Sequence, residues 1–417
     1  MKNLTFSHFR SPAVVIYGRI LSICANLLSA GLISQILGPS GRGISSYSLV
    51  SVLTVSAVFG FGLPQAARKA AKDSKKNSAI GNSALISMAT IIFSIPSAVL
   101  VTNALGETIS GLTRSLLITG VSIAPLLTLA RVLQAALNGR GSYFKYAVAI
   151  STQPLILLVS LPVLHFCGVF SVDGVLTAQI ISILVSLLVG IWLLRPKFEV
   201  SLPFRYFASS VRYLPRDIAM ALRERLDVLI ATWLLGTNFG GLYAVAVAIG
   251  SMPTLISQAV SNASFNLAKK DCRRTQFELI GFLQASVLVA SALGIVISLI
   301  VPFFVPWFFG AAFQESVPLI WAMLAIRSFG SSFSSIPEAA LLATGHEREV
   351  PFQGLIVLLF FAVLAIPAGY FLGGVAFVLA FYFSEIVTGA IWGPKAGVAI
   401  LSRWAMSMRT ARLLLTR

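Results

Sequence analysis

Cysteine and histidine are scarce in this chain. Three cysteines and three histidines are spread over 417 residues, at Cys24, Cys167, Cys272, His8, His165 and His346. Their spacing matches neither a disulfide framework nor the ligand set of a metal site. We therefore expect no disulfide scaffold and no metal, and the sequence offers no motif for another cofactor.

Charged residues are also few. They make up 11% of the chain, whereas hydrophobic residues make up 57%, and this composition is typical of a protein with many membrane spans. The longest connection between the predicted spans, residues 195–212, has no room for a nucleotide-binding or glycosyl-transfer domain. An enzyme is therefore not expected.

Apolar stretches of about 20 residues, the length needed to cross a bilayer, recur along the whole sequence. We predict an all-α polytopic membrane protein with about twelve transmembrane helices in two six-helix bundles. The first span lacks a small-residue cleavage site behind it and should stay in the protein. The predicted spans are residues 12–36, 44–64, 79–102, 115–137, 146–167, 174–194, 213–235, 240–264, 277–300, 315–338, 351–372 and 375–395.

Acidic residues are the scarcer of the two charge types, with 14 Asp and Glu against 31 Lys and Arg, which gives a net charge of +17. Nucleic acid would be one partner for so basic a protein. Most of the basic residues, however, fall in alternate loops, and the positive-inside rule places such loops on the cytoplasmic side. Both termini are therefore expected in the cytoplasm, and nucleic acid is not an expected partner.

The two halves of the chain share a pattern at an offset of 198 residues. GPSGRG at 38–43 aligns with GTNFGG at 236–241, and KDSKK at 72–76 aligns with KDCRR at 270–274. The pattern predicts parallel repeats with pseudo-two-fold symmetry, residues 1–200 and 201–417, and a substrate site between them. Independent selection of glycine for outer turns and of basic residues for inner loops would give the same pattern.

The most informative segment is the charged stretch before the seventh predicted span. RYLPRDIAMALRERLD, residues 212–227, runs into about ten apolar residues, too few to cross a core of roughly 30 Å at about 1.5 Å per residue. The helix must therefore begin near Tyr213. A charge facing lipid would cost about 2.5–3.5 kcal/mol. This half-helix must instead line water or other helices.

The charges of this half-helix form two stripes at about 100° per residue. Arg216, Arg223 and Asp227 lie on one stripe, and Arg223 and Asp227 are spaced to pair. Asp217 and Glu224 lie on the neighbouring stripe. The three acids would either serve proton or sodium coupling or balance the arginines.

Single arginines interrupt other apolar spans, at Arg19, Arg131 and Arg327. A cationic interior suits a large anion, because guanidinium groups match phosphate oxygens in bidentate geometry. A structural ion pair or a snorkelling side chain is the alternative for each. The candidate substrate-binding residues are thus Arg19, Arg131, Arg216, Arg223 and Arg327.

Three motifs carry a family resemblance: LGPSGRG after the first span, ALNGRGSYFKYA after the fourth, and RLDVLIATWLLGTNFGGLYAVA through the seventh and eighth. They resemble the polysaccharide-exporter flippases of the multidrug/oligosaccharidyl-lipid/polysaccharide exporter superfamily. The resemblance implies translocation of an undecaprenyl-pyrophosphate-linked oligosaccharide from the inner to the outer leaflet, by alternating access through a cationic cavity. It assigns the seventh-helix aspartate of the family to Asp227 and a first-helix cavity arginine to Arg19.

The resemblance also implies a location and partners. The protein would lie in a bacterial inner membrane, in contact with membrane lipid, and a polysaccharide polymerase and glycosyltransferases of the same pathway would be its partners. Two other functions stay open. A cation-coupled multidrug exporter would need a net acidic cavity, and an integral-membrane glycosyltransferase or polymerase would need a large outer loop.

Overall fold

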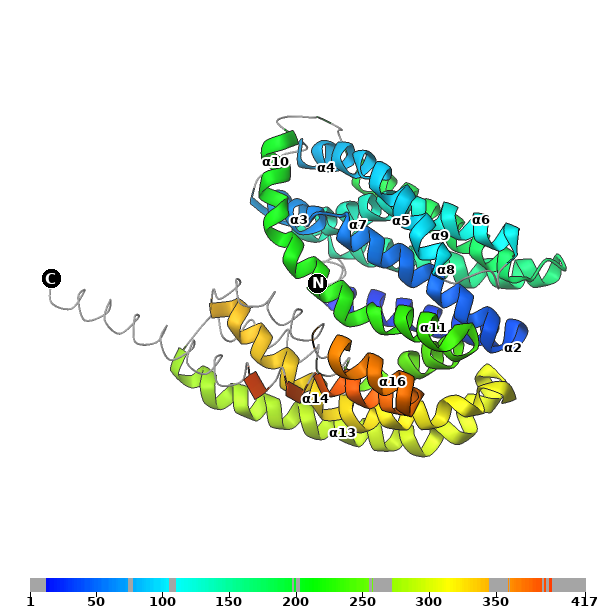
Figure 1. Cartoon of the computed structure of the whole chain (residues 1–417). Coiled ribbons are helices and arrows are strands. Elements are labelled where there is room, and N and C mark those ends of the chain that lie inside the picture. Colours follow the sequence, from blue (N-terminus) through cyan, green and yellow to red (C-terminus); the bar gives the residue numbers. More distant parts are fainter. Residues whose placement is uncertain are drawn as a thin grey trace, which may run out of the picture. The chain divides into compact units, whose positions relative to one another are not determined.

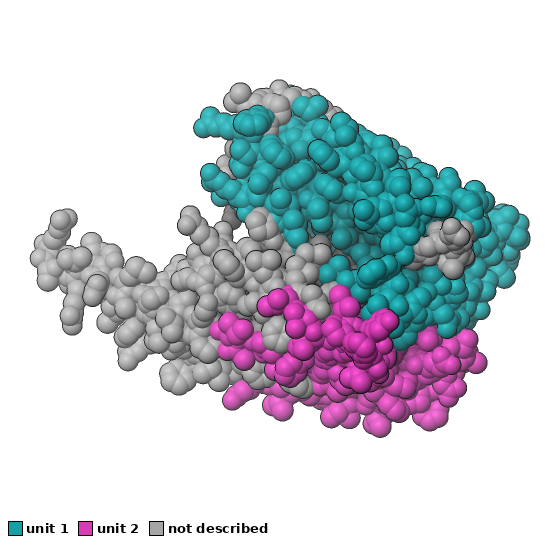
Figure 2. All heavy atoms as spheres, viewed as in Figure 1, with its two compact units in different colours: residues 1–241 teal, residues 242–417 magenta. Residues whose placement is uncertain are grey.

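The structure of this protein is a computed structural model. It describes residues 13–73, 78–104, 110–196, 199, 203–254, 257, 272–344, 359, 361–384, 386–387 and 390–391, and this part of the chain is helical, with turns and no strand (Figure 1). The chain divides into two compact units, residues 1–241 and residues 242–417 (Figure 2).

The helices of unit 1 follow the apolar stretches of the sequence, since in lipid the backbone groups of a segment must pair within it. Across both units, the described residues contain six helices that are long and apolar enough to span a membrane, or seven if a pair bent by 44° at Thr90 is one span. Unit 1 contains α2 (Ala13–Val58), α3 (Leu63–Asp73), α4 (Ser78–Ala89), α5 (Ile91–Asn103), α6 (Gly111–Ser122), α7 (Ala124–Gly139), α8 (Tyr143–Phe166), α9 (Val172–Leu194), α10 (Pro203–Ser210), a 3₁₀ turn η3 (Val211–Tyr213) and most of α11 (Leu214–Gly250).

Small residues let the helices of unit 1 approach closely. Helix association in lipid depends on van der Waals packing, because lipid chains are as apolar as the side chains. At the contact of α2 with α8, a Cβ on Gly18 would lie 2.7 Å from the Cβ of Ala147. The hydroxyl of Ser151 donates a hydrogen bond to the carbonyl of Gly18 over 2.9 Å. This contact fixes the first span against the fifth.

Helix α7 is the centre of the largest described apolar cluster in unit 1. Leu133, Ala136 and Leu137 on α7 pack with Leu187 and Leu194 on α9, and all five are buried. The α7 helix that carries Arg131 is therefore held rigidly on its apolar side.

The segment after α9 packs back onto unit 1. A Cβ on Gly81 would lie 2.2 Å from the carbonyl oxygen of Glu199, and Ser83 donates a hydrogen bond to the Tyr206 hydroxyl over 3.1 Å. Burial raises the pKa of Tyr206 to about 12. Through Tyr206, part of the predicted second half packs onto the first half. The boundary between the compact units falls at residue 241. The repeat boundary at residue 200 stays a prediction.

Unit 2 is built around two long neighbouring helices. It contains α13 (Cys272–Phe309), a 3₁₀ segment η4 (Ala311–Ser316), α14 (Val317–Thr344), a π-helical turn η5 (Phe361–Ala365), α16 (Ile366–Leu372) and the helix Gly374–Ser384. A Cβ on Gly294 of α13 would lie 2.1 Å from the Ser328 hydroxyl of α14. The Ser328 side chain thus packs directly against the backbone of α13 at that point.

Two segments that lie between predicted spans, residues 37–43 and 301–314, are largely helical. The helix α2 continues through residues 37–43 and breaks at one residue, Gly38, with φ 65° and ψ −173°. Pro39 follows at the first position of the next helical segment, where its missing N–H has no intrahelical partner to lose. The helix α13 runs to Phe309, past Pro302 and Pro306. The helices at these two places therefore extend beyond the predicted spans, because the predicted bounds relied on the usual tendency of glycine and proline to end helices.

The break in α2 has a counterpart in α11. Gly236, the residue paired with Gly38 by the offset of 198, has φ 88° and ψ 167° inside α11. The structure therefore supports the equivalence of GPSGRG and GTNFGG. Parts of the second matched pair, KDSKK and KDCRR, lie outside the described residues.

The two broken segments touch through their glycines. A Cβ on Gly43 would lie 1.9 Å from the carbonyl oxygen of Thr237, and a Cβ on Gly241 would lie 1.9 Å from that of Pro39. Because the offset pairs Pro39 with Thr237 and Gly43 with Gly241, the contact is reciprocal, as in a two-fold interface. We call these four residues the glycine contact. Beside it the hydroxyls of Ser40 and Thr237 share a hydrogen bond of 3.0 Å.

Candidate functional site

The charged stretch of residues 212–227 is helical, as predicted. The helix α11 begins at Leu214, directly after the turn η3, and continues unbroken to Gly236. At about 1.5 Å per residue these residues cover roughly 33 Å, the thickness of a hydrocarbon core. The charged residues thus occupy the first half of a helical segment that is long enough to cross the core.

Asp227 lies about 20 Å along this helix, since it is thirteen residues from Leu214. Its side chain is 1% exposed, and Oδ1 accepts a hydrogen bond of 2.8 Å from the N–H of Val228. It also interacts with a further group. The carboxylate is therefore shielded from lipid, as the cost of lipid exposure requires.

The side chains of Arg216, Asp217, Arg223 and Glu224 lie outside the described residues, although the backbone at these positions is helical. Their assignment to one cavity-facing surface stays a prediction.

Two of the single arginines belong to unit 1. Arg19 is exposed on α2, one residue after the tight contact at Gly18. Arg131 on α7 is partly buried and interacts with a neighbouring group. Arg131 therefore has a contact within the protein, and its role in substrate binding stays a prediction.

Arg327 on α14 belongs to unit 2 and lies against an aromatic ring. Its guanidinium carbon is 4.5 Å from the ring centre of Tyr382, and its Nη1 donates a long hydrogen bond of 3.5 Å to the Tyr382 hydroxyl. A guanidinium over a tyrosine face at this distance is a cation–π pair. Tyr382 is buried and fixed by edge contact with Phe381. The sequence alone gave no indication of this partner.

A further arginine, Arg42, falls between the first two predicted spans. It lies within α2, four residues after the break at Gly38. Its Nε–H is buried and has no hydrogen-bond partner in the described part of the chain. Proline is common at the first position of a helix, so Pro39 was the signal that could have placed a helix start before Arg42.

The candidate residues divide between the two units. Arg19, Arg131 and the charged half of α11 lie in unit 1, and Arg327 lies in unit 2. Their convergence on one site stays a prediction.

Comparison with known proteins identifies the family. Residues 32–318 match the model of the family described as "Polysaccharide biosynthesis protein". No sequence among curated proteins gives a significant match.

Solved structures of transporters share the fold. An inward-facing multidrug resistance MATE family transporter of the MOP superfamily is 14% identical, with a TM-score of 0.70 over 94% of this chain and 98% of the other. The lipid II flippase MurJ in an inward closed conformation is 15% identical, with a TM-score of 0.71 over 94% and 87%. A MOP superfamily transporter from Pyrococcus furiosus is 15% identical, with a TM-score of 0.63 over 94% and 95%.

At these identities the structural matches establish the fold alone, and they confirm the predicted class: an all-α, multi-pass membrane protein with the fold of these transporters. The family match covers more than half of the chain. The chain therefore belongs to the polysaccharide biosynthesis protein family and has the fold of a MOP superfamily transporter.

Proposed function

We propose that the protein is a flippase that moves an undecaprenyl-pyrophosphate-linked oligosaccharide from the cytoplasmic to the outer leaflet, without catalytic chemistry of its own. Membership of the polysaccharide biosynthesis family supports the substrate class. Alternating access through a central cavity would carry the charged headgroup, while the lipid chain stays in the bilayer.

The observation that carries this proposal is the charged first half of α11 within a full-length span. Arg216 and Arg223 belong to this half-helix, and a pyrophosphate can accept bidentate hydrogen bonds from their guanidinium groups. Arg19, Arg131 and Arg327 would add positive charge to the same site. Asp217, Glu224 and Asp227 would balance the arginines or couple transport to protons or sodium.

The test is the loss of transport on removing the arginines. We expect Arg223→Ala to lower polymer export or flipping of a pyrophosphate-linked oligosaccharide at least about tenfold, since a charged hydrogen bond contributes about 1.5–3 kcal/mol. Arg216→Ala should act in the same direction. Arg223→Lys should restore part of the activity, because lysine keeps the charge but loses the bidentate geometry.

The matched control is Arg68→Ala, which removes an exposed arginine from α3. Export should stay near the wild-type level in this variant, and all variants should reach the membrane in equal amounts. Unchanged export in the double variant Arg216→Ala/Arg223→Ala would refute the proposed site.

A cation-coupled multidrug exporter is the second candidate, because MATE transporters share the fold. In the MOP superfamily transporter from Pyrococcus furiosus, a reverse polarity of the binding pocket suggests a different function for that protein. An arginine-rich interior would give the present chain the polarity that suits anions. Resistance to cationic dyes, or their efflux, would favour the exporter instead.

The proposed location is a bacterial inner membrane with both termini in the cytoplasm. A polysaccharide polymerase and glycosyltransferases would act beside the protein. The charge asymmetry of the loops supports this orientation.

A further inference from the structure

Arg42 in the second segment of α2 carries a charge that has no counterpart. Its Nε–H is covered by protein and has no hydrogen-bond partner in the described part of the chain, and none of the described acids forms an ion pair with it. Buried charges are normally paired, because the loss of water around an unpaired guanidinium is costly. An unpaired arginine in a membrane protein is therefore a candidate functional residue.

The acid on the neighbouring helix is already used. The start of α9 packs on this part of α2, since a Cβ on Gly41 would lie 3.4 Å from a methyl group of Val172. The next residue, Asp173, accepts a hydrogen bond of 2.6 Å from the Thr113 hydroxyl of α6. The charge of Arg42 is thus open to an anion from outside the protein.

Two helix starts meet next to Arg42. The second segment of α2 begins at Pro39, after the break at Gly38, and the second segment of α11 begins at Thr237, after the break at Gly236. The glycine contact holds these two starts together. The first N–H groups of a helix have no partner within it and form the positive end of its dipole. Helix starts are therefore common binding places for phosphate and other anions.

The space in front of both helix starts is open. A Cβ on Gly38 or on Gly236 would meet nothing within 4 Å. The side chain of a helical residue covers the turn before its own Cα, and for Arg42, the fourth residue of its segment, that turn is the helix start. Two positive helix ends and one guanidinium thus lie together, and an anion between them would stabilise this arrangement.

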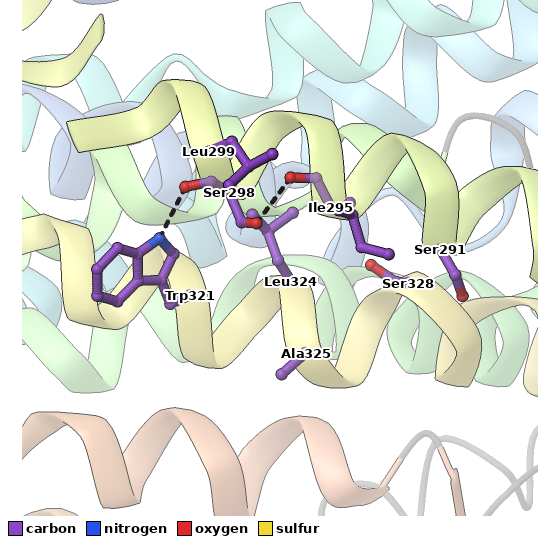
Figure 3. A pocket seen from close by; sticks show the side chains of 9 residues that line it. Ser291, Ile295, Ser298, Leu299, Trp321, Leu324, Ala325 and Ser328 are labelled. Carbon is purple, nitrogen blue, oxygen red and sulfur yellow. Dashed lines mark hydrogen bonds between the residues drawn. The ribbon is translucent and has the colours of Figure 1, made fainter. Parts of the chain in front are cut away.

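The groove between α13 and α14 in unit 2 has the opposite character. The described residues that line it carry no charge, and the indole N–H of Trp321 already donates a hydrogen bond of 3.1 Å to the carbonyl of Ser298 (Figure 3). Such a groove offers an anion no charged donor. Of these two places in the described residues, the one at Arg42 is therefore the one that suits a phosphate.

We propose that Arg42 and the two helix starts bind a phosphate group at the outer end of unit 1 and receive the pyrophosphate of the substrate after it has crossed, an inference that rests on the function proposed above. On α11, Thr237 lies about 21 Å beyond Arg223 and about 31 Å beyond Arg216, at about 1.5 Å per residue. The charged half-helix and Arg42 thus occupy opposite ends of the span. The half-helix takes up the headgroup at the cytoplasmic end, and Arg42 holds it at the outer end before release.

The experiment measures binding to the purified full-length chain in a neutral detergent. The probe is farnesyl pyrophosphate, farnesol shows the contribution of the chain alone, and phosphatidylglycerol represents a phospholipid, whose headgroup carries the same phosphate chemistry. Titrations use the wild type and Arg216→Ala/Arg223→Ala, which lacks the arginines of the half-helix, each with and without Arg42→Gln. The matched control is Arg114→Gln, which removes an exposed arginine that donates a hydrogen bond to Asn103.

We expect Arg216→Ala/Arg223→Ala to keep one site for farnesyl pyrophosphate and none for farnesol. Adding Arg42→Gln should weaken this site at least about tenfold, because it removes a charged hydrogen bond, whereas adding Arg114→Gln should leave the affinity unchanged. Without ligand, Arg42→Gln should unfold at the temperature of the wild type or above it, since it removes an unpaired buried charge. A merely structural arginine would give a lower unfolding temperature on substitution.

Three results would overturn the inference. The first is equal affinity for farnesyl pyrophosphate with and without Arg42, and the second is a lower unfolding temperature of Arg42→Gln in the absence of ligand. The third is phosphatidylglycerol binding at Arg42 as tightly as farnesyl pyrophosphate, because the site would then belong to membrane lipid.

The outer site and the proposed function fail separately. Arg42→Gln alone should slow flipping several-fold and leave binding at the half-helix intact. Binding that does not need Arg42, together with flipping that needs Arg216 and Arg223, would overturn the outer site alone. Flipping that needs neither Arg216 nor Arg223 would overturn the proposed function.

Discussion

The glycine contact gives the sharpest prediction about stability. In Gly43→Ala the new Cβ would lie 1.9 Å from the carbonyl oxygen of Thr237, and real Cβ contacts essentially never fall below 3.0 Å. The two segments must therefore separate by at least 1.1 Å, the difference between these distances. The obstacle is backbone, so no side-chain rotation can relieve the clash.

The expected cost follows from this separation. Overpacking of a tight contact costs about 1–3 kcal/mol, and stretching the 3.0 Å hydrogen bond between Ser40 and Thr237 adds up to about 1 kcal/mol. The higher helix propensity of alanine offsets up to about 1 kcal/mol of this loss in stability. We expect Gly43→Ala to be destabilising by about 1–3 kcal/mol in total.

The assay is thermal unfolding of the purified protein in one detergent, followed by tryptophan fluorescence. Gly111→Ala is the matched control, because a Cβ there meets nothing within 4 Å and should be neutral or slightly stabilising. Gly241→Ala should resemble Gly43→Ala, since its Cβ would lie 1.9 Å from the carbonyl of Pro39. The double variant Gly43→Ala/Gly241→Ala should cost less than the sum, because either substitution already opens the same contact.

Two results would refute this reasoning. Gly43→Ala as stable as the Gly111→Ala control would mean that the backbones do not meet as closely as 1.9 Å suggests. Fully additive effects of Gly43→Ala and Gly241→Ala would mean that the two glycines belong to independent contacts.

Two other predictions concern single aromatic residues. Tyr382→Leu should weaken binding of a pyrophosphate-linked substrate by a few-fold, because a cation–π pair that holds Arg327 contributes about 0.5–2 kcal/mol, and Tyr382→Phe should retain most of the affinity; equal affinities for the wild type and Tyr382→Leu, measured by titration, would contradict this role. Burial raises the pKa of Tyr206 to about 12 from 10.0, so the neutral phenol contributes stability that is fully present below pH 10 and lost as the pH rises through 12. Between pH 9 and 12, the free energy of unfolding of the wild type should therefore fall by up to about 2 kcal/mol more than that of Tyr206→Phe, as followed by thermal unfolding at each pH. Identical pH profiles for the two proteins would rule out this contribution.

The class of the protein and the helical nature of its charged segment follow from the amino-acid sequence. Apolar runs of span length in a chain with so few charges have few other folds available, because a backbone in lipid must form its hydrogen bonds within each helix. The same length argument required a helix from about Tyr213 onward, and α11 begins at Leu214. The match of GPSGRG with GTNFGG was also visible in the sequence, and its first glycines, Gly38 and Gly236, both have a positive φ.

What each of these residues touches is set by packing in three dimensions. Arg42 falls between two predicted spans, yet Pro39 starts a new helical segment directly after Gly38, and Arg42 therefore lies in α2. Nothing near Arg327 in sequence indicates Tyr382, because these residues, 55 positions apart, are brought together only by packing in unit 2. The reciprocal approach of Gly43 and Gly241 is likewise a property of two segments far apart in the chain. Local periodicity fixes which residues share a helix face, whereas contact between faces depends on the packing of the whole unit.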